Sequence, residues 1–316
     1  MPPAKFFCRV PETQEEWNCA VKQSTLNNDP HAQQQWNSAS KLSKEEYLLL
    51  RCLWTQHPKK DAGKMVRKFK LGQYCDDARD WLQQFSPFKA YLRQLKTPPA
   101  TTKFDPSTND PGPWGAGIFE IPAVEQARIT SAVCKQTPMN KSKRPIDEDS
   151  VNMSLVAFLI AVAAKQPSLH SRWTPHRKPI KAQFGNGTEM EAQIDGYFGE
   201  ENGPMKIILE TKAGSRKHHE PQVSMQEAAE VVSLLMTQEV DPKRPLFLIS
   251  QDGADIYITG AVFDKAYLNW ITNNRKKLPS HKFLQMMQYG PWNLKKAGDM
   301  EQFAVNSLAI MLAVDS

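Results

Sequence analysis

The sequence predicts an α/β protein in which a short mixed sheet flanked by helices follows a helical N-terminal region. Two observations indicate this class. Helical and strand patterns alternate over residues 146–316 in the order helix, hairpin, helix, hairpin, which is typical of layered α/β domains. Apolar residues in 1–96 recur at helical spacing instead. Residues 97–145 are rich in breaker residues, so we predict a helical region, then a linker and bridge, then an α/β domain (146–316).

The N-terminal region contains two predicted helices. Ser43 and Glu46 form the S-x-x-E pattern of a capping box, which predicts a helix that begins there and runs through Trp54. A second helical pattern covers 76–95, with a break at Pro87 because proline disrupts a helix interior.

Three segments lie between the predicted helices or between the predicted regions. Residues 59–70 carry six basic residues and one acid, a composition that suits either a nucleic-acid-binding helix or an ordinary exposed helix. Breaker-rich stretches at 97–117 and 137–145 show no periodicity and are predicted to be linkers. One helix is predicted between them, at 124–134.

The α/β domain contains most of the predicted strands. A segment holding Trp173, Arg177 and Lys178 is expected to be irregular. Turns are predicted at the sequences GEENGP and DG, each between two strands. The elements expected are helices at 148–165, 221–237, 263–275 and 299–314, and strands at 189–198, 205–213, 246–250 and 254–260.

Composition excludes several classes of protein. The chain has 316 residues and 40% hydrophobic residues, so collagen-like, coiled-coil and wholly disordered structures are excluded. Its net charge of +6 permits a nucleic-acid partner without requiring one. The sequence contains no P-loop, no G-x-S-x-G elbow and no H-E-x-x-H motif.

The same composition predicts an intracellular protein, in the nucleus or the cytoplasm. Five cysteines, an odd number, lie far apart and include no CxxC pair, so we expect reduced thiols. The first ten residues, MPPAKFFCRV, lack the apolar core of a signal peptide. The most apolar runs, 154–164 and 304–314, are about half the roughly 20 residues that span a bilayer, so no membrane partner is expected.

One pair of predicted strands carries charge that a packing argument does not explain. Glu210 and Lys212 are two residues apart on a strand, so both point to one face, directly after the apolar sequence MKIIL. A buried charge is costly unless it is paired or binds metal. Asp195 lies on the preceding strand, 15 residues before Glu210 in the sequence, and Glu210 is the only glutamate followed two places later by lysine.

These residue types are the ones that phosphodiester hydrolysis needs. Two carboxylates supply the oxygen ligands that Mg²⁺ prefers. The ion polarises a phosphoryl oxygen and acidifies water, and a lysine ammonium orients that water and offsets charge on the phosphate.

At these residues the chain resembles the PD-(D/E)XK nuclease superfamily, with its restriction-endonuclease-like fold, and within it the fungal nuclease-like proteins. The resemblance covers about 148–267. Ile194 stands where the proline that gives the family its name would be. The matching segments are EDSVN at the first helix, Trp173 and Arg177 as a W…R segment, IDG at the metal-binding aspartate, ILETKAGSR at the ExK strand, and PQVSMQEAAEVV at the next helix.

The resemblance implies a role for each matching residue. The metal ligands would be Asp195 and Glu210, with Glu148 as an accessory acid, and the ion would be Mg²⁺ or Mn²⁺. Lys212 would orient the attacking water. The polar residue of the following helix, which contacts substrate or the catalytic carboxylate, would be Gln222 or Gln226.

Four basic residues flank the predicted site and are candidates for phosphate contacts: Arg177, Lys178, Arg216 and Lys217. The implied partner is nucleic acid, with DNA favoured over RNA. A homodimer is also compatible with the resemblance, because restriction-type folds often dimerise to cut both strands.

Each of these assignments has a simpler alternative. Glu210 and Lys212 are also explained as an ion pair on a solvated face, and Asp195 as a turn acid beside glycine. Glu148 is typical of any helix N-terminus, because the helix dipole favours acids there. The glutamines of the following helix are equally explained as a solvated stripe, and the flanking basic residues as a contribution to solubility.

Three functional hypotheses follow. The first is a metal-dependent nuclease that cleaves phosphodiester bonds. The second is an inactive nuclease-like fold that binds nucleic acid or protein without cutting. The third is a helical interaction protein whose α/β half is only a scaffold.

Overall fold

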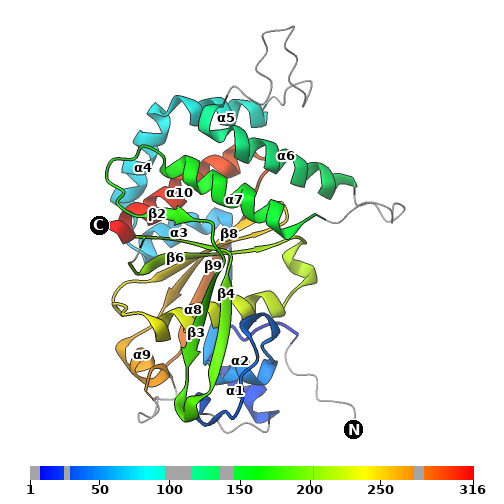
Figure 1. Ribbon diagram of the computed structural model, residues 1–316, viewed down its shortest axis with the longest axis vertical. Helices are drawn as coiled ribbons and strands as arrows, with labels where there is room; N and C mark the ends of the chain where they lie inside the picture. The colour runs from blue at the N-terminus through cyan, green and yellow to red at the C-terminus, as the bar shows by residue number, and fades with distance from the viewer. Residues whose placement is uncertain (1–7, 25–28, 97–115, 136–145, 202, 274–280) are drawn as a thin grey trace.

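One mixed sheet forms the centre of the molecule and takes strands from both halves of the sequence (Figure 1). The structure is a computed structural model that describes residues 8–24, 29–96, 116–135, 146–201, 203–273 and 281–316. Within these residues the sheet has seven strands. In spatial order they are β1 (Cys52–Pro58), β9 (Leu284–Asn293), β8 (Asp255–Val262), β7 (Leu246–Asp252), β6 (Met205–Lys212), β5 (Gly196–Gly199) and β2 (Arg172–Thr174).

The strand directions are mixed. β1 runs parallel to β9, and β6 parallel to β7, while the other neighbours are antiparallel. A separate two-stranded sheet pairs β3 (Lys178–Gln183) with β4 (Glu189–Ile194). Asp195 alone separates β4 from β5, so the chain passes from the small sheet to the large one at this residue.

Helices cover both faces of the sheet (Figure 1). On one face lie α3 (Ala62–Lys68), α4 (Gly72–Gln84), α5 (Ser86–Lys96), α6 (Glu120–Lys135), α7 (Glu148–Ala163) and α10 (Ala297–Asp315). On the other lie α2 (Lys44–Leu49), α8 (Gln222–Thr237), α9 (Lys265–Ile271) and the small sheet. The remaining helices are α1 (Gln14–Lys22) and the short 3-10 turns η1 (Pro30–Ala32), η2 (Ala39–Lys41), η3 (Lys59–Asp61), η5 (Gly117–Phe119), η6 (Gly185–Gly187) and η7 (Arg216–His218).

Strand β6 is buried on both sides, and this explains its apolar sequence. Ile207 and Leu209 pack against α7 and α10 in the core on one face of the sheet. Ile208 packs against α8 in the core on the other face. Because successive side chains alternate between faces, Glu210 falls on the α8 side, as its spacing predicts. The strand therefore carries a carboxylate into a covered face of the sheet.

Most of the predicted elements are present. The capping box is confirmed: Ser43 Oγ accepts from Glu46 N, and the Glu46 carboxylate accepts from Ser43 N. The break at Pro87 is confirmed to within two residues, since α4 ends at Gln84 and α5 begins at Ser86. The predicted α/β class with a mixed sheet flanked by helices is also confirmed.

Three predictions of secondary structure are wrong. The first helix does not run through Trp54: it ends at Leu49, Arg51 adopts a positive φ of 50°, and Trp54 lies in strand β1. The reason is that a continuous apolar run suits a buried helix or a buried strand equally well. The expected strand over 189–198 is two strands in different sheets, and part of the expected irregular basic segment forms β2 and β3.

The remaining predictions concern β9, the bridge helix and the linkers, and they differ in outcome. Strand β9 was not among the predicted elements, and together with β1 it adds two strands to the sheet beyond β8. Residues 116–135 of the predicted linker and bridge form η5 and α6, so the helix expected at 124–134 is confirmed. The linkers themselves lie almost wholly outside the described residues. The division of the chain into three parts stays a prediction.

Two further observations concern the cysteines and the helices. Four of the five cysteines have described side chains, and all four of these are free. In the described part of the chain, no helix combines the length and the apolar character that crossing a membrane requires.

Substituting Gly260 tests the packing of Phe69 on β8. An added Cβ would overlap the Phe69 ring, which itself packs edge-on against Phe247 with 5.2 Å between ring centroids. Gly260→Ala should therefore lower the free energy of unfolding by about 1–3 kcal/mol, the usual cost of overpacking a core. Urea unfolding monitored by circular dichroism measures this change.

Gly298→Ala is the matched control. This glycine lies in α10, and an added Cβ would meet nothing within 4 Å. Because alanine favours helix more than glycine does, this variant should unfold with a free energy that is unchanged or higher by up to about 1 kcal/mol. Equal stability of the two variants would contradict the described packing of Phe69.

Candidate functional site

Asp195 is fixed beside β6 by backbone and side-chain hydrogen bonds. Its N–H donates to Leu209 O at 3.0 Å, which aligns it with the end of β6. Its Oδ2 accepts from the N–H of Thr211 at 2.9 Å and from the Thr211 hydroxyl at 2.7 Å. Its Oδ1 accepts from Arg177 Nε at 3.2 Å, and Asn152 of α7 donates to its backbone oxygen at 3.1 Å. The carboxylate is thus held in one orientation.

Glu210 is a buried carboxylate with one oxygen satisfied and one not. Its side chain is 3% exposed. Oε1 accepts from Lys212 Nζ at 2.5 Å and from Gln226 Nε2 at 2.6 Å. Oε2 is buried and has no hydrogen-bond partner among the described residues. A buried polar atom without a partner is costly, so this oxygen is the uncommitted acceptor of the side chain.

Helix α8 supports Glu210 from above the sheet. Gln226 Nε2 donates to Glu210 Oε1 and, at 2.8 Å, to Glu230 Oε1 one helical turn further on. Glu230 is fully buried, and within the described structure its Oε2 also lacks a partner. The amide of Gln226 therefore bridges two buried carboxylates and holds both in place.

Helix α7 brings a third acid to the same place. The helix begins at Glu148, and Asp147 is its N-cap: the Asp147 side chain accepts a hydrogen bond from Asp149 N at 3.2 Å. Glu148 Oε1 lies 3.9 Å from Lys212 Nζ. Arg177 connects the helix to the site, since its NH2 donates to Asp149 Oδ1 at 2.7 Å while its Nε contacts Asp195.

These side chains face one cavity of about 370 Å³. The structure therefore brings together six of the ten residues that the sequence predicted: Glu148, Arg177, Asp195, Glu210, Lys212 and Gln226. The remaining walls come from Glu191 and Gln193 of β4 and from Ser38, Ser40 and Lys41 in or beside η2. A segment near the N-terminus thus closes a site built mainly by the second half of the chain.

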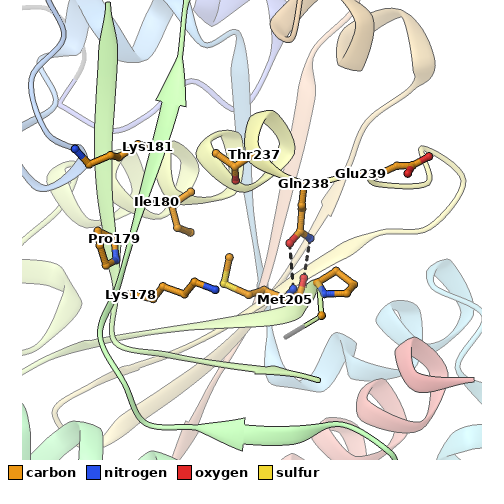
Figure 2. A pocket seen from close by; sticks show the side chains of 10 residues that line it. Lys178, Pro179, Ile180, Lys181, Met205, Thr237, Gln238 and Glu239 are labelled. Atoms are coloured by element: carbon orange, nitrogen blue, oxygen red, sulfur yellow. Dashed lines mark hydrogen bonds between the residues drawn. The ribbon is translucent and has the colours of Figure 1, made fainter. Parts of the chain in front are cut away.

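Gln222 and Lys178 lie elsewhere. Gln222 does not line the cavity, because its amide donates to Ser40 O at 3.1 Å and Leu42 O at 3.2 Å and so anchors the η2 segment to α8. Lys178 lines a separate cavity near the start of β6, where Gln238 pairs with the backbone of Met205 (Figure 2). Its Nζ lies 5.2 Å from the centroid of the Tyr197 ring.

The expectation that Arg216 reaches a phosphate in this cavity is not supported by its position. Its side chain is 4% exposed, and its guanidinium donates inward to Asp252 at 2.5 Å and to Glu227. Its neighbour Lys217 is exposed and lines a second cavity together with it. Neither residue lines the cavity that holds Glu210.

Burial dominates the acid–base properties of the cavity. Desolvation raises the pKa of Glu210 to about 8 from its ordinary value of 4.5, although Lys212 opposes the shift. Desolvation also raises the pKa of Glu148, and raises that of Glu230 well above its usual range. Burial by itself lowers the pKa of Lys212, but the carboxylates of Glu210 and Glu148 outweigh it, so the lysine stays charged.

The donor set fits a hard divalent cation in part. No group of three His, Cys, Asp or Glu side chains in the described structure is arranged to hold a metal ion. Mg²⁺ nevertheless needs only one or two carboxylates, because it keeps several waters. Glu210 offers an unpartnered oxygen, Asp195 lines the same cavity, and Lys212 already balances part of their charge. These residues are chemically suited to one such ion.

Sequence reasoning missed several residues of the site. Thr211 lies between Glu210 and Lys212 but was assigned only to the opposite face, where it in fact donates to Asp195. Glu230 follows Gln226 by four residues, a spacing that places both on one face of a helix. That spacing was a usable signal. Nothing in the local pattern around Ser38 or Lys41 indicates that they reach the cavity.

No family model, curated protein or solved structure matches the chain.

The raised pKa of Glu210 gives a stability prediction for metal-free protein. Because its pKa is higher folded than unfolded, the stabilisation from its bound proton is complete below about pH 4.5 and is lost as the pH rises through about 8. Glu210→Gln is neutral at every pH. Relative to the parent, its free energy of unfolding should therefore increase between pH 5 and 8, by at most about 1.4 kcal/mol per unit. Urea unfolding in EDTA measures the difference, and a difference that stays flat with pH would contradict the assignment.

Proposed function

We propose that the protein is a metal-dependent nuclease that hydrolyses phosphodiester bonds of nucleic acid, with DNA favoured over RNA. The observation that carries the proposal is that Glu210, whose buried Oε2 has no partner among the described residues, lines one cavity together with Asp195, Glu148 and Lys212. Acidic ligands, a lysine and an accessible cavity are the parts that such a reaction needs.

The order of elements supports membership of the PD-(D/E)XK superfamily. Helix α7 comes first, then the antiparallel pair β5 and β6, then helix α8, and then β7, which is parallel to β6. The segments that resemble the family fall on these elements in the same order. Ile194 still departs from the family pattern, where a proline would precede the aspartate.

The mechanism assigns a separate task to each residue. Asp195 and Glu210 would hold a divalent ion with Glu148 beside them, and the ion would polarise a phosphoryl oxygen and acidify the attacking water. Lys212 orients that water by donating to it. As water adds to phosphorus it loses a proton to solvent, the bond from phosphorus to the leaving oxygen breaks, and that oxygen takes up a proton from solvent. Arg177 at the cavity offsets negative charge on the phosphate.

Cleavage assays with variants test this proposal. Purified protein is incubated with labelled duplex DNA, single-stranded DNA and RNA, with Mg²⁺ or with EDTA. The parent should cut at least one substrate only with the metal. Glu210→Gln and Lys212→Met should each lower the cleavage rate by about 10²-fold or more, because each removes a group that acts directly on the reaction.

Two exposed residues provide matched controls. Glu239→Gln and Lys243→Met make the same chemical changes outside the cavity and should cut at the parental rate. If the folded parent cuts none of the three substrates, the nuclease proposal fails. Binding of nucleic acid that survives Glu210→Gln would then favour the alternative of an inactive nuclease-like fold, which agrees with the absence of a three-ligand metal group among the described residues.

Binding of the metal should depend on pH. With the pKa of Glu210 at about 8, the ion must displace a proton below that pH. The affinity for Mn²⁺ should therefore rise by up to about tenfold for each pH unit up to 8 and level off above it. Electron paramagnetic resonance of free Mn²⁺ gives the affinity directly. An affinity independent of pH between 6 and 8, or one that Glu210→Gln leaves unchanged, would refute Glu210 as a ligand.

A further inference from the structure

A second polar cavity lies three strands away from Glu210. It has a volume of about 530 Å³ and is formed where η7 meets the end of β1, the beginning of β8 and the later half of β9. Its lining includes Arg216, Lys217, Tyr257 and Gln288. Its volume is typical of cavities that bind small organic molecules.

Gln288 supplies the observation that points to a ligand. Its residue is 2% exposed, it lines the cavity, and its Nε2 has no hydrogen-bond partner in the described structure. A buried N–H donor without an acceptor destabilises a fold, and such donors are rare. The amide therefore lacks an acceptor within the described structure, and an acceptor atom that enters the cavity would supply one.

The opposite wall of the cavity is rigid. Arg216 donates to Asp252 at 2.5 Å and to Glu227 and Ser250, so its own N–H groups are used within the protein. Its guanidinium lies 4.7 Å from the centroid of the Tyr257 ring. This network fixes the ring at the cavity, and an aromatic ring beside hydrogen-bonding groups suits a planar heterocycle.

The cavity lining carries both signs of charge: Lys217 supplies a cation suited to a phosphate, while the carboxylates of Glu220 and Asp255 are already engaged by Arg216 and Asn293. Lys217 is exposed, lines the cavity and follows Arg216 directly in η7. A flexible ammonium of this kind neutralises phosphate groups, whereas the buried Arg216 is already committed to carboxylates.

We propose that this cavity binds the nucleobase of a nucleotide, with a base acceptor atom on Gln288 Nε2 and the adjoining phosphate on Lys217. The proposal rests on the proposed nuclease function, because it makes this nucleotide part of the polynucleotide substrate. Neighbouring strands are about 4.8 Å apart, and β9 is three strands from β6, so the subsite lies about 15 Å from Glu210. A base that enters this cavity cannot be paired at the same time, which makes single-stranded nucleic acid the substrate class.

Binding measured without metal tests the subsite independently of cleavage. In EDTA, fluorescence anisotropy follows a labelled single-stranded octamer, and calorimetry follows nucleoside monophosphates and the matching nucleosides. Gln288→Leu should weaken octamer and monophosphate binding about tenfold, because one hydrogen bond is lost. It should not lower the melting temperature, because it removes a buried donor that has no partner. Gln285→Leu, on the same strand but away from the cavity, is the control and should bind as the parent does.

Lys217→Ala provides a second route that does not depend on a core substitution. This exposed change should weaken monophosphate binding about threefold to tenfold and leave nucleoside binding unchanged. If Gln288→Leu does not fold, the ratio of monophosphate affinity to nucleoside affinity, compared between Lys217→Ala and the parent, decides. If monophosphates and the octamer bind with similar affinity, the cavity is a site for one nucleotide unit. If the octamer binds much more tightly, the cavity is a subsite of a longer groove. Both results support the proposal.

Some results overturn the subsite, and others overturn only the nuclease. Parental affinity in both variants, or no binding of any probe, contradicts the subsite even if the protein cleaves nucleic acid. Nucleotide binding that Gln288→Leu weakens, in a protein that cuts nothing with Mg²⁺, contradicts the nuclease and leaves the nucleotide site in place.

Discussion

The buried carboxylate of Glu210 is the constraint on which the site depends. A charge on a strand that is covered on both faces would be prohibitive by itself. Lys212 and Gln226 satisfy one of its oxygens, and the other stays without a partner in the described structure. Desolvation accordingly raises its pKa to about 8. The fold therefore keeps a buried acid with one oxygen uncommitted, and the proposed metal site rests on this feature.

The surrounding architecture serves to hold that carboxylate. Helix α8 connects the parallel strands β6 and β7 and places Gln226 over the sheet, while α7 brings Glu148 and fixes Asp195 through Asn152. Strand β6 continues into η7, where Arg216 ties the chain to α8 and β7 through buried carboxylates. The candidate active site and the second cavity are thus built on one continuous framework of β6, α8 and the sheet between them, which links the two proposals physically.

The sequence predicted the α/β class and most of the elements, because strong periodicity and a capping box report local structure directly. The ExK triplet and the upstream aspartate predicted the cavity residues, because alternation along a strand fixes which side chains share a face. The failures have a common physical origin. Strands β1 and β9 pair across more than 200 residues, the role of Arg216 depends on burial, and Ser38 and Lys41 reach the cavity only through tertiary packing. Local patterns carry no information about such contacts.

A crystal structure of the protein grown or soaked with Mn²⁺ at a pH above 8 tests the central claim most directly, because anomalous scattering identifies the ion and its ligands. The account predicts an anomalous peak at coordinating distance from Glu210 Oε2 and the Asp195 carboxylate, with Lys212 retained beside them. It also predicts that the peak disappears in Glu210→Gln crystals. An empty cavity in the parent, with Oε2 still buried and unpartnered at saturating Mn²⁺, would contradict it.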